Sequence, residues 1–289
     1  MYLPDFDYYA PPDLVEACQL VREFGNSAKI LAGGTDLLHK MKHTELAPEA
    51  VISLKKLSEL KGIRYLPGQG VIIGALTTQN ELADSPLLHR KYRSVCEAAH
   101  NMANNQIRHI GTVGGNIVNA VPSADLPPIL MVLGAKVKLV NIDGERTVPL
   151  DEFFLGVHQT IRRDDEILTE IEIPDQKTTG STSIRFGLRK SGALAVAGAA
   201  VAVEMDGETC RSARIVLAAA APVPMRARAA ERLITGQQIT PDLLEQAGAA
   251  AARESNPRDS IRGSAEYRRD LIRILTRRAL HKAITEGHV

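Results

Sequence analysis

Residues 31–37 read Leu31-Ala32-Gly33-Gly34-Thr35-Asp36-Leu37 and continue the run 29–32, which predicts a β-strand. Two adjacent glycines permit backbone conformations that a Cβ atom hinders, so consecutive N–H groups can point into one concavity, here called a nest. Together with the positive end of a following helix, a nest binds a phosphate without any lysine. The plainer alternative is a left-handed turn in which Thr35 or Asp36 caps the helix.

A second glycine-rich turn follows at Gly111-Thr112-Val113-Gly114-Gly115-Asn116-Ile117. Gly114 and Gly115 would again bring backbone close to a ligand, the Thr112 hydroxyl is a further donor, and Asp125 offers a carboxylate to ribose or ribityl hydroxyls. The alternative for Asp125 is that it caps a helix beginning at Leu126-Pro127-Pro128. Two nests suit the diphosphate of a dinucleotide better than a single phosphate.

The pattern around these turns predicts an α+β chain in three parts. A small N-terminal unit and a strand–helix middle unit are followed by the polar run 175–182, which we interpret as a linker, and then by a third unit of strands and helices. The expected elements are a helix at 13–24, strands at 29–32 and 51–54, a hairpin at 62–75, strands at 135–140 and 166–173, strands near 195–205 and 212–218, and helices near 224–234, 241–253 and 264–286. The predicted domains are 1–60, 61–175 and 176–289.

Composition and missing motifs exclude several classes of protein. The 289 residues are 44% hydrophobic and 24% charged, as in an ordinary globular protein, and the net charge of +1 gives no field that favours nucleic acid. Residues 68–74 look like GxGxxG, but the third glycine comes one position late and a strand is predicted next, so we expect a hairpin and no Rossmann fold. Neither GxxxxGK[ST] nor GxSxG occurs. With no signal peptide or apolar span at the start, we expect a cytoplasmic chain that does not enter a membrane.

Metal-ligating patterns are also missing. Cys18, Cys96 and Cys210 are far apart with no CxxC pair, and His39 and His43 lack a third ligand. We therefore expect no metal site, no iron–sulfur cluster and no catalytic acid or base within this chain.

Over essentially its whole length, the chain resembles the FAD-binding (medium) subunits of the xanthine dehydrogenase and carbon monoxide dehydrogenase family of molybdenum hydroxylases. The resemblance rests on the two glycine turns together with Gln106-Ile107-Arg108, the run 122–128 and the run 165–174. It implies a two-part FAD-binding region of the vanillyl-alcohol oxidase type, followed by a C-terminal α+β domain of the CO dehydrogenase flavoprotein type.

The resemblance also implies a set of cofactor-binding residues. Residues 32–37 would hold the FAD pyrophosphate, the second turn would meet another face of the cofactor, Leu168 would pack on the isoalloxazine, and Arg185 stands where relatives usually have a lysine near the flavin or its phosphates. The full set is Ala32, Gly33, Gly34, Thr35, Asp36, Leu37, Thr112, Gly114, Gly115, Asn116, Asp125, Leu168 and Arg185. Ala193-Leu194-Ala195 departs from the usual Asp-Ile-Ala, and the cysteine-rich cluster loop of one branch is missing, so FAD is the only cofactor expected.

By the same resemblance, electrons would pass from a molybdopterin-containing large subunit through the [2Fe-2S] clusters of a small subunit to this flavin, and then to an external acceptor. The assembly would be a dimer of heterotrimers. Two alternatives remain open at this point: a self-sufficient FAD-dependent oxidoreductase of the same fold, and a basic interaction module built on the last helix, which carries Arg268, Arg269, Arg273, Arg277, Arg278 and Lys282. The sequence names neither the organic substrate nor the acceptor, which can be NAD, a quinone, ferredoxin or oxygen.

Overall fold

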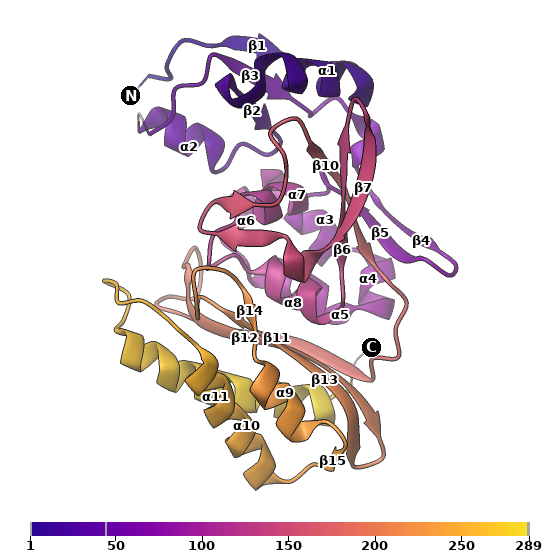
Figure 1. Cartoon of the computed structure of the whole chain (residues 1–289), viewed down its shortest axis with the longest axis vertical. Coiled ribbons are helices and arrows are strands. Elements are labelled where there is room, and N and C mark those ends of the chain that lie inside the picture. Colours follow the sequence, from indigo (N-terminus) through magenta and orange to yellow (C-terminus); the bar gives the residue numbers. More distant parts are fainter. Residues whose placement is uncertain (1, 44, 288–289) are drawn as a thin grey trace.

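Apart from one two-stranded hairpin, three sheets of the described residues follow one another along the long axis of the molecule (Figure 1). The computed structural model describes residues 2–43 and 45–287. Runs of consecutive helices, between residues 79 and 132, and of consecutive strands, between residues 167 and 226, confirm the predicted α+β class. The three sheets fall within residues 1–60, 61–175 and 176–289, respectively, while the division into three domains stays a prediction.

The N-terminal unit is a small parallel sheet in the order β1-β3-β2. Asp13 caps the first helix, because its side chain accepts a hydrogen bond from the N–H of Glu16. Buried apolar side chains of that helix, including Val21, pack with Ile52 of the sheet. The elements are β1 (Asp7–Tyr9), α1 (Leu14–Phe24), η1 (Gly25–Ser27), β2 (Ala28–Leu31), α2 (Leu37–Lys42), β3 (Ala50–Ser53) and η2 (Ser58–Leu60).

The middle unit is an antiparallel sheet in the order β4-β5-β10-β6-β7. Short helices pack beside it and share its core (Figure 1). The GxGxxG-like run forms the β4–β5 hairpin, with Gly68 and Gly70 at φ of +81° and +112°, so the prediction against a Rossmann turn is correct. The elements are β4 (Ile63–Leu66), β5 (Gly70–Gly74), α3 (Gln79–Ala83), α4 (Pro86–Lys91), α5 (Arg93–Asn101), α6 (Asn105–Ile110), α7 (Val113–Val118), α8 (Leu126–Val132), β6 (Lys136–Asn141), β7 (Gly144–Pro149), η3 (Leu150–Glu152), β8 (Phe154–Gly156), β9 (Gln159–Thr160) and β10 (Ile167–Ile173).

The C-terminal unit places two long helices and a short one on an antiparallel sheet (Figure 1). Small residues allow the close approach: a Cβ atom on Gly180 would lie 1.9 Å from the carbonyl oxygen of Ala283 on the last helix. The predicted linker 175–182 is therefore too long, because Gly180 already begins a strand and pairs with Val203. The elements are β11 (Gly180–Gly187), β12 (Ala195–Asp206), β13 (Thr209–Ala218), β14 (Met225–Arg226), α9 (Arg228–Ile234), β15 (Gln237–Gln238), α10 (Pro241–Glu254) and α11 (Ala265–Thr285).

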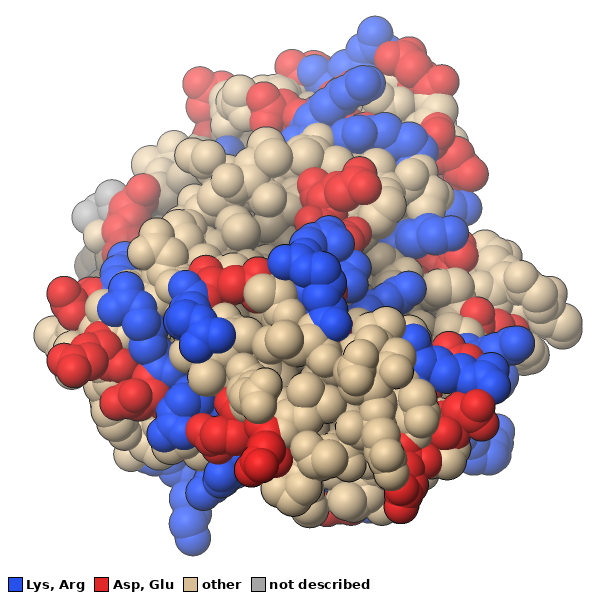
Figure 2. Space-filling view, turned by 60° about the horizontal axis from the view of Figure 1, so that its bottom comes forward, with Lys and Arg blue, Asp and Glu red and all other residues tan. Residues whose placement is uncertain are grey.

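Three of the six basic residues that the basic module would use are paired with carboxylates of neighbouring helices. Arg273 and Arg277 both pair with Glu245 of α10, and Lys282 pairs with Glu97 of α5. Figure 2 shows basic and acidic side chains interspersed over the face that it displays, with no continuous basic patch. This is the charge pattern of a packed, solvated helix and does not favour the basic interaction module. No helix among the described residues has both the length and the apolar character needed to cross a bilayer.

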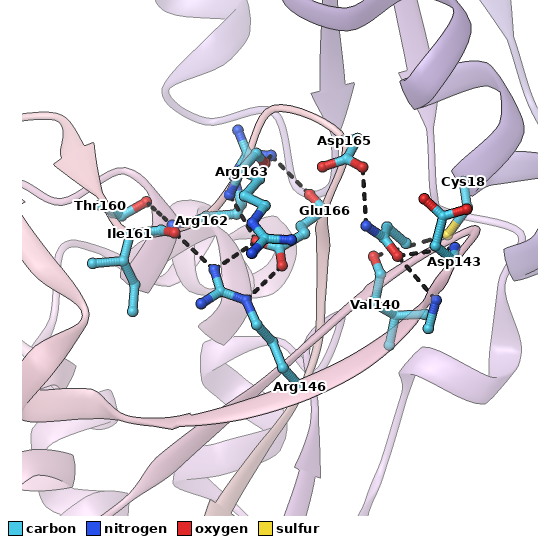
Figure 3. A network of polar contacts seen from close by, with 12 residues as sticks. Cys18, Val140, Asp143, Arg146, Thr160, Ile161, Arg162, Arg163, Asp165 and Glu166 are labelled. Atoms are coloured by element: carbon cyan, nitrogen blue, oxygen red, sulfur yellow. Dashed lines mark hydrogen bonds and ion pairs between the residues drawn. The ribbon is translucent and has the colours of Figure 1, made fainter.

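A polar network fixes the start of β10 (Figure 3). Glu166, whose side chain is 3% exposed, accepts two hydrogen bonds from the Arg146 guanidinium and one from the N–H of Arg163. Burial raises the pKa of this carboxyl, but the hydrogen bonds and charge of Arg146 and the N–H of Arg163 outweigh it, so the pKa lies below its ordinary value. The network anchors β10 two residues before Leu168.

Replacing this carboxylate is expected to weaken the fold. Glu166→Gln should lower the free energy of unfolding by about 1.5–3 kcal/mol at pH 7, because charge-assisted hydrogen bonds are lost. A lowered folded-state pKa means that this stability is present above the ordinary value of 4.5 and is lost as the pH falls through the lower folded value. Urea unfolding at pH 7 and pH 4 measures both effects; Glu145→Gln, at a 61% exposed position, is the control. Equal stability of the Glu166 variant and wild type at pH 7 would contradict the prediction.

Candidate functional site

The two glycine-rich turns lie against each other. Gly33, between β2 and α2, packs so closely on the end of α6 that a Cβ atom there would lie 2.1 Å from the carbonyl oxygen of Ile110. The Thr35 hydroxyl lies 3.8 Å from the position of a Cβ atom on Gly111. Gly34 adopts a φ of +83°, which L side chains rarely do. Only glycines allow the N-terminal and middle units to meet at this distance.

The first turn leaves its donors free. Among the described residues, no acceptor receives a hydrogen bond from the N–H groups of residues 33–36. Asp36 precedes α2 but has helical backbone angles and makes no capping bond with its side chain, and the Thr35 hydroxyl lies 3.4 Å from the Asp36 carboxylate. The alternative in which either residue caps the helix is therefore wrong. The turn instead presents successive donors suited to an anion.

The second turn differs from what we expected. Thr112 caps the short helix α7, and the N–H groups that follow it are all satisfied within the protein. The donors and acceptors are Val113 N to Thr77 O (2.9 Å), Gly114 N to Ala75 O (2.9 Å), Gly115 N to Thr112 Oγ1 (3.1 Å) and Asn116 N to Thr112 O (3.0 Å). The prediction of a second nest is therefore wrong, because helix formation and the cap use the donors that a nest would need.

The two glycines of the second turn also have different surroundings. A Cβ atom on Gly114 would lie 2.8 Å from both Cβ and O of Ala75, whereas one on Gly115 would meet only the Thr112 hydroxyl, at 3.0 Å. Gly114 is thus required for packing against the segment that follows β5, whereas Gly115 has a single close neighbour. Beside it, the Oδ1 atom of Asn116 is buried and has no partner among the described residues. A buried acceptor without a donor is costly, and a polar ligand can supply that donor.

Asp125 and Arg185 form an ion pair between the middle and C-terminal units. Arg185 Nε lies 3.5 Å from Asp125 Oδ1, with side-chain exposures of 18% and 12%. Asp125 has helical backbone angles and makes no capping bond, so the capping alternative is wrong. Arg185 also donates to the carbonyl oxygens of Asn101 and Ala193. Burial raises the pKa of Asp125 to about 6, and the charge of Arg185 opposes that rise.

Leu168 lies on β10 opposite Leu139, and its side chain is only 5% exposed. It belongs to the main hydrophobic core with Ile171. This residue already has packing partners in the chain, and its contact with the flavin ring stays a prediction.

His158 is an exposed histidine that links three segments near the site. It has a φ of +59°, its N–H donates to Ala120 O (2.9 Å), and its Nδ1 lies 2.7 Å from Asn119 O. Asn119 in turn accepts a hydrogen bond from Lys40 of α2 at 3.4 Å. These contacts connect three parts of the chain. They are the β8–β9 hairpin, which carries His158, the segment at residues 119–120 that leads to Asp125, and helix α2, which follows the nest. No sequence pattern marks them, because the partners are carbonyl groups far along the chain.

Comparison with known proteins identifies the family of the chain. Residues 4–176 match the model of the FAD binding domain in molybdopterin dehydrogenase, and residues 183–283 match that of the CO dehydrogenase flavoprotein C-terminal domain. The chain belongs to this family of FAD-binding subunits. The flavoprotein subunit is 35% identical to the carbon monoxide dehydrogenase medium chain of Hydrogenophaga pseudoflava, over 98% of each chain. It is 30% identical to a putative xanthine dehydrogenase FAD-binding subunit of Escherichia coli, over 96% of this chain and 95% of that one.

Comparison with solved structures leads to the same family. A carbon monoxide dehydrogenase structure from Hydrogenophaga pseudoflava superposes with a TM-score of 0.96 at 35% identity and covers 99% of this chain and 100% of that one. Quinoline 2-oxidoreductase from Pseudomonas putida 86 gives a TM-score of 0.94 at 28% identity and full coverage of both chains. The flavoprotein subunit is therefore an FAD-containing oxidoreductase component of the molybdenum hydroxylase type, as the resemblance implied.

The geometry fits this cofactor. Free N–H groups at 33–36 match the charge of a diphosphate, while the unmet Oδ1 of Asn116 and the carboxylate of Asp125 are acceptors for hydroxyl or amide donors. Among residues 2–43 and 45–287, no three His, Cys, Asp or Glu side chains are grouped to hold a metal ion.

Proposed function

We propose that the flavoprotein subunit transfers electrons from the [2Fe-2S] clusters of a partner subunit, through FAD, to an external acceptor. The observation that carries this proposal is the free nest at 33–36, packed against a second turn in which Asn116 Oδ1 is a buried acceptor without a partner among the described residues. FAD supplies the one- and two-electron chemistry when bound. The protein binds and orients it.

Within this proposal each predicted residue has a defined task. The nest, with Ala32 and Leu37 at its ends, holds the pyrophosphate by backbone donors, and Gly115 leaves room for the cofactor beside Asn116. Asp125 accepts hydrogen bonds from FAD hydroxyls, while Arg185 holds that carboxylate and keeps a positive charge near the flavin. Thr112 and Gly114 shape α7, and Leu168 supports the isoalloxazine from β10.

Partner subunits are part of the proposal. The curated relatives include medium chains of carbon monoxide dehydrogenase and a xanthine dehydrogenase FAD-binding subunit, names that imply small and large partners. We propose that these partners carry the [2Fe-2S] clusters and the molybdopterin, that the assembly is a dimer of heterotrimers, and that it works in the cytoplasm. The three cysteines are free and buried, in keeping with a reducing compartment.

Co-purification tests the proposal. Tagged chain expressed in its native host should bring down two further subunits in equal amounts, and the complex should contain one FAD per flavoprotein subunit together with iron, acid-labile sulfide and molybdenum. Recovery of a flavin-loaded chain alone, fully active with an organic substrate, would support the self-sufficient oxidoreductase instead.

The pKa of Asp125 predicts a pH dependence of cofactor affinity. Hydrogen bonds from FAD hydroxyls favour the ionised carboxylate, so affinity should rise as the pH passes through about 6 and then level off. The expected gain is about fivefold between pH 5 and 6 and about tenfold between pH 5 and 7, because the ionised fraction of a group with a pKa of about 6 rises by these factors. Flavin fluorescence titrations at pH 5–8 measure it, and Asp125→Asn should flatten the profile.

The stability of the FAD-free chain should show the opposite trend. A folded-state pKa raised above the ordinary value of 3.8 gives stability that is present below that value and is lost as the pH rises through about 6. If affinity and FAD-free stability changed together with pH, the Asp125 carboxylate would not be the group that contacts the cofactor.

A further inference from the structure

The connection between α10 and α11, residues 255–264, carries an isoleucine that contributes nothing to the core of this chain. Ile261 is 100% exposed. A fully buried isoleucine stabilises a structure by about 1.5–3 kcal/mol, and this one gains none of that from its own chain. Figure 1 shows the connection projecting at the left of the view, beyond the end of the neighbouring helices.

Further apolar surface lies beside this connection. Tyr267 is 43% exposed and makes an edge contact with Phe186 at the end of β11. Leu194 is 53% exposed and lies two residues before Val196, whose carbonyl oxygen accepts a hydrogen bond from Arg268. Ile261, Tyr267 and Leu194 therefore belong to one end of the C-terminal unit.

The same end carries positive charge that the chain does not neutralise. Arg268 is 4% exposed, and its guanidinium donates only to uncharged acceptors: Val196 O, Gly263 O and Ser260 Oγ. Burial and the charges of Arg262 and Arg258 lower its pKa. Within the described part of the chain, no carboxylate lies within 4.0 Å of any of these three arginines. The nearby Asp259 accepts from the N–H of Ala265 instead.

Arg262 has an unmet hydrogen-bond donor. Its Nε atom is buried and has no partner in the described residues. A buried guanidinium donor without an acceptor, next to a buried arginine without a counter-ion, is unfavourable. Arg262 is partly exposed, so a carboxylate from outside can pair with it and offset the positive charge of the two arginines. An arginine fork prefers that ligand.

We propose that Leu194, Arg258, Ile261, Arg262 and Tyr267 form a docking surface, here called the 261 surface, for a carboxylate-bearing segment of a partner subunit. Ile261 enters an apolar pocket of the partner, and a partner carboxylate pairs with Arg262 above Arg268. The proposal rests on the proposed function, because it requires that the chain works within a complex. Charge complementarity selects the partner over a second copy of this chain, whose same surface is also basic.

Substitution of the exposed isoleucine tests the surface. Ile261→Glu should weaken rebinding of the FAD-loaded chain to its partner subunits by about tenfold or more, because it removes an apolar anchor and adds a charge to a desolvated contact. Val15→Glu, at a 60% exposed position on α1, is the matched control and should bind like wild type. Melting temperature and FAD content should be unchanged in both, since neither side chain has a place in the core.

Arg262→Ala tests the contribution of charge to the 261 surface. It should also weaken rebinding and reduce the dependence of the affinity on salt concentration. Unchanged affinity of both the Ile261 and Arg262 variants would overturn the 261 surface while leaving the proposed function intact. Failure of wild-type chain to bind any partner subunit would instead overturn the proposed function. Conversion of a wild-type dimer of the isolated chain to a monomer by Ile261→Glu, seen by sedimentation, would assign the surface to a second copy and contradict the proposal.

Discussion

The isolated chain, loaded with FAD and mixed anaerobically with an aldehyde, a purine or an N-heterocycle, is expected to keep its flavin oxidised. The reason is chemical: the buried carboxylate of Asp125, whose pKa is raised, is paired with Arg185 and is assigned to cofactor binding. Substrate oxidation by FAD alone would need a positioned acid or base. Flavin absorbance near its long-wavelength maximum measures the outcome.

Two additions complete this experiment. Dithionite should bleach the flavin of the isolated chain, which shows that the cofactor is bound and competent, and substrate should bleach it once the partner subunits are present. Reduction of the isolated chain by an organic substrate at catalytic rates would replace the subunit proposal with a self-sufficient flavoenzyme.

Alanine substitutions at the two adjacent glycines of the second turn are expected to have different effects, one on stability and the other on FAD affinity. Gly114→Ala places a Cβ atom 2.8 Å from Ala75 and should lower the free energy of unfolding by about 1–3 kcal/mol, the usual range for overpacking. Gly115→Ala meets only the Thr112 hydroxyl and should leave the stability of the FAD-free chain within about 1 kcal/mol of wild type. Its FAD affinity should nonetheless fall by about tenfold or more, because the new methyl group occupies cofactor space.

Chemical denaturation without FAD and flavin titration separate the two effects. Gly34→Val is the positive control, since its φ of +83° and its 2.9 Å approach to Leu31 Cδ1 make it unsuited to any side chain, and both stability and binding should be lost. Full FAD affinity in the Gly115 variant would remove Gly115 and Asn116 from the cofactor site.

Local sequence rules predicted much of this fold. The helix expected at 13–24, the strand expected at 166–173 and the hairpin expected from the late third glycine of 68–74 each depend on short-range backbone geometry, and the structure agrees with all three. The error at the linker has a long-range cause. Gly180 looked like a loop residue, but it is a glycine because Ala283 of α11 packs on it.

The candidate site was also predictable only where it depends on residues close together in the sequence. The free donors at 33–36 follow from two glycines at a strand end, so the sequence sufficed for the first turn. At the second turn, the acceptors Thr77 and Ala75 come from a different segment, and nothing near Gly114 indicates that its N–H is already used. The Asp125–Arg185 pair and the His158 contacts join residues 60 and 39 positions apart, respectively, beyond the reach of any local pattern.

The strand order of the middle sheet has a consequence for biosynthesis. β10 lies between β5 and β6, although it is the last of the five strands to leave the ribosome. Until residue 173 emerges, β5 and β6 lack their common neighbour, and the apolar side chains that β10 will cover remain in water. Such a late central strand slows folding and exposes strand edges to chaperones. We expect nascent chains that end before residue 167 to be chaperone-bound and unable to retain flavin, so that cofactor insertion follows translation of the whole FAD-binding region.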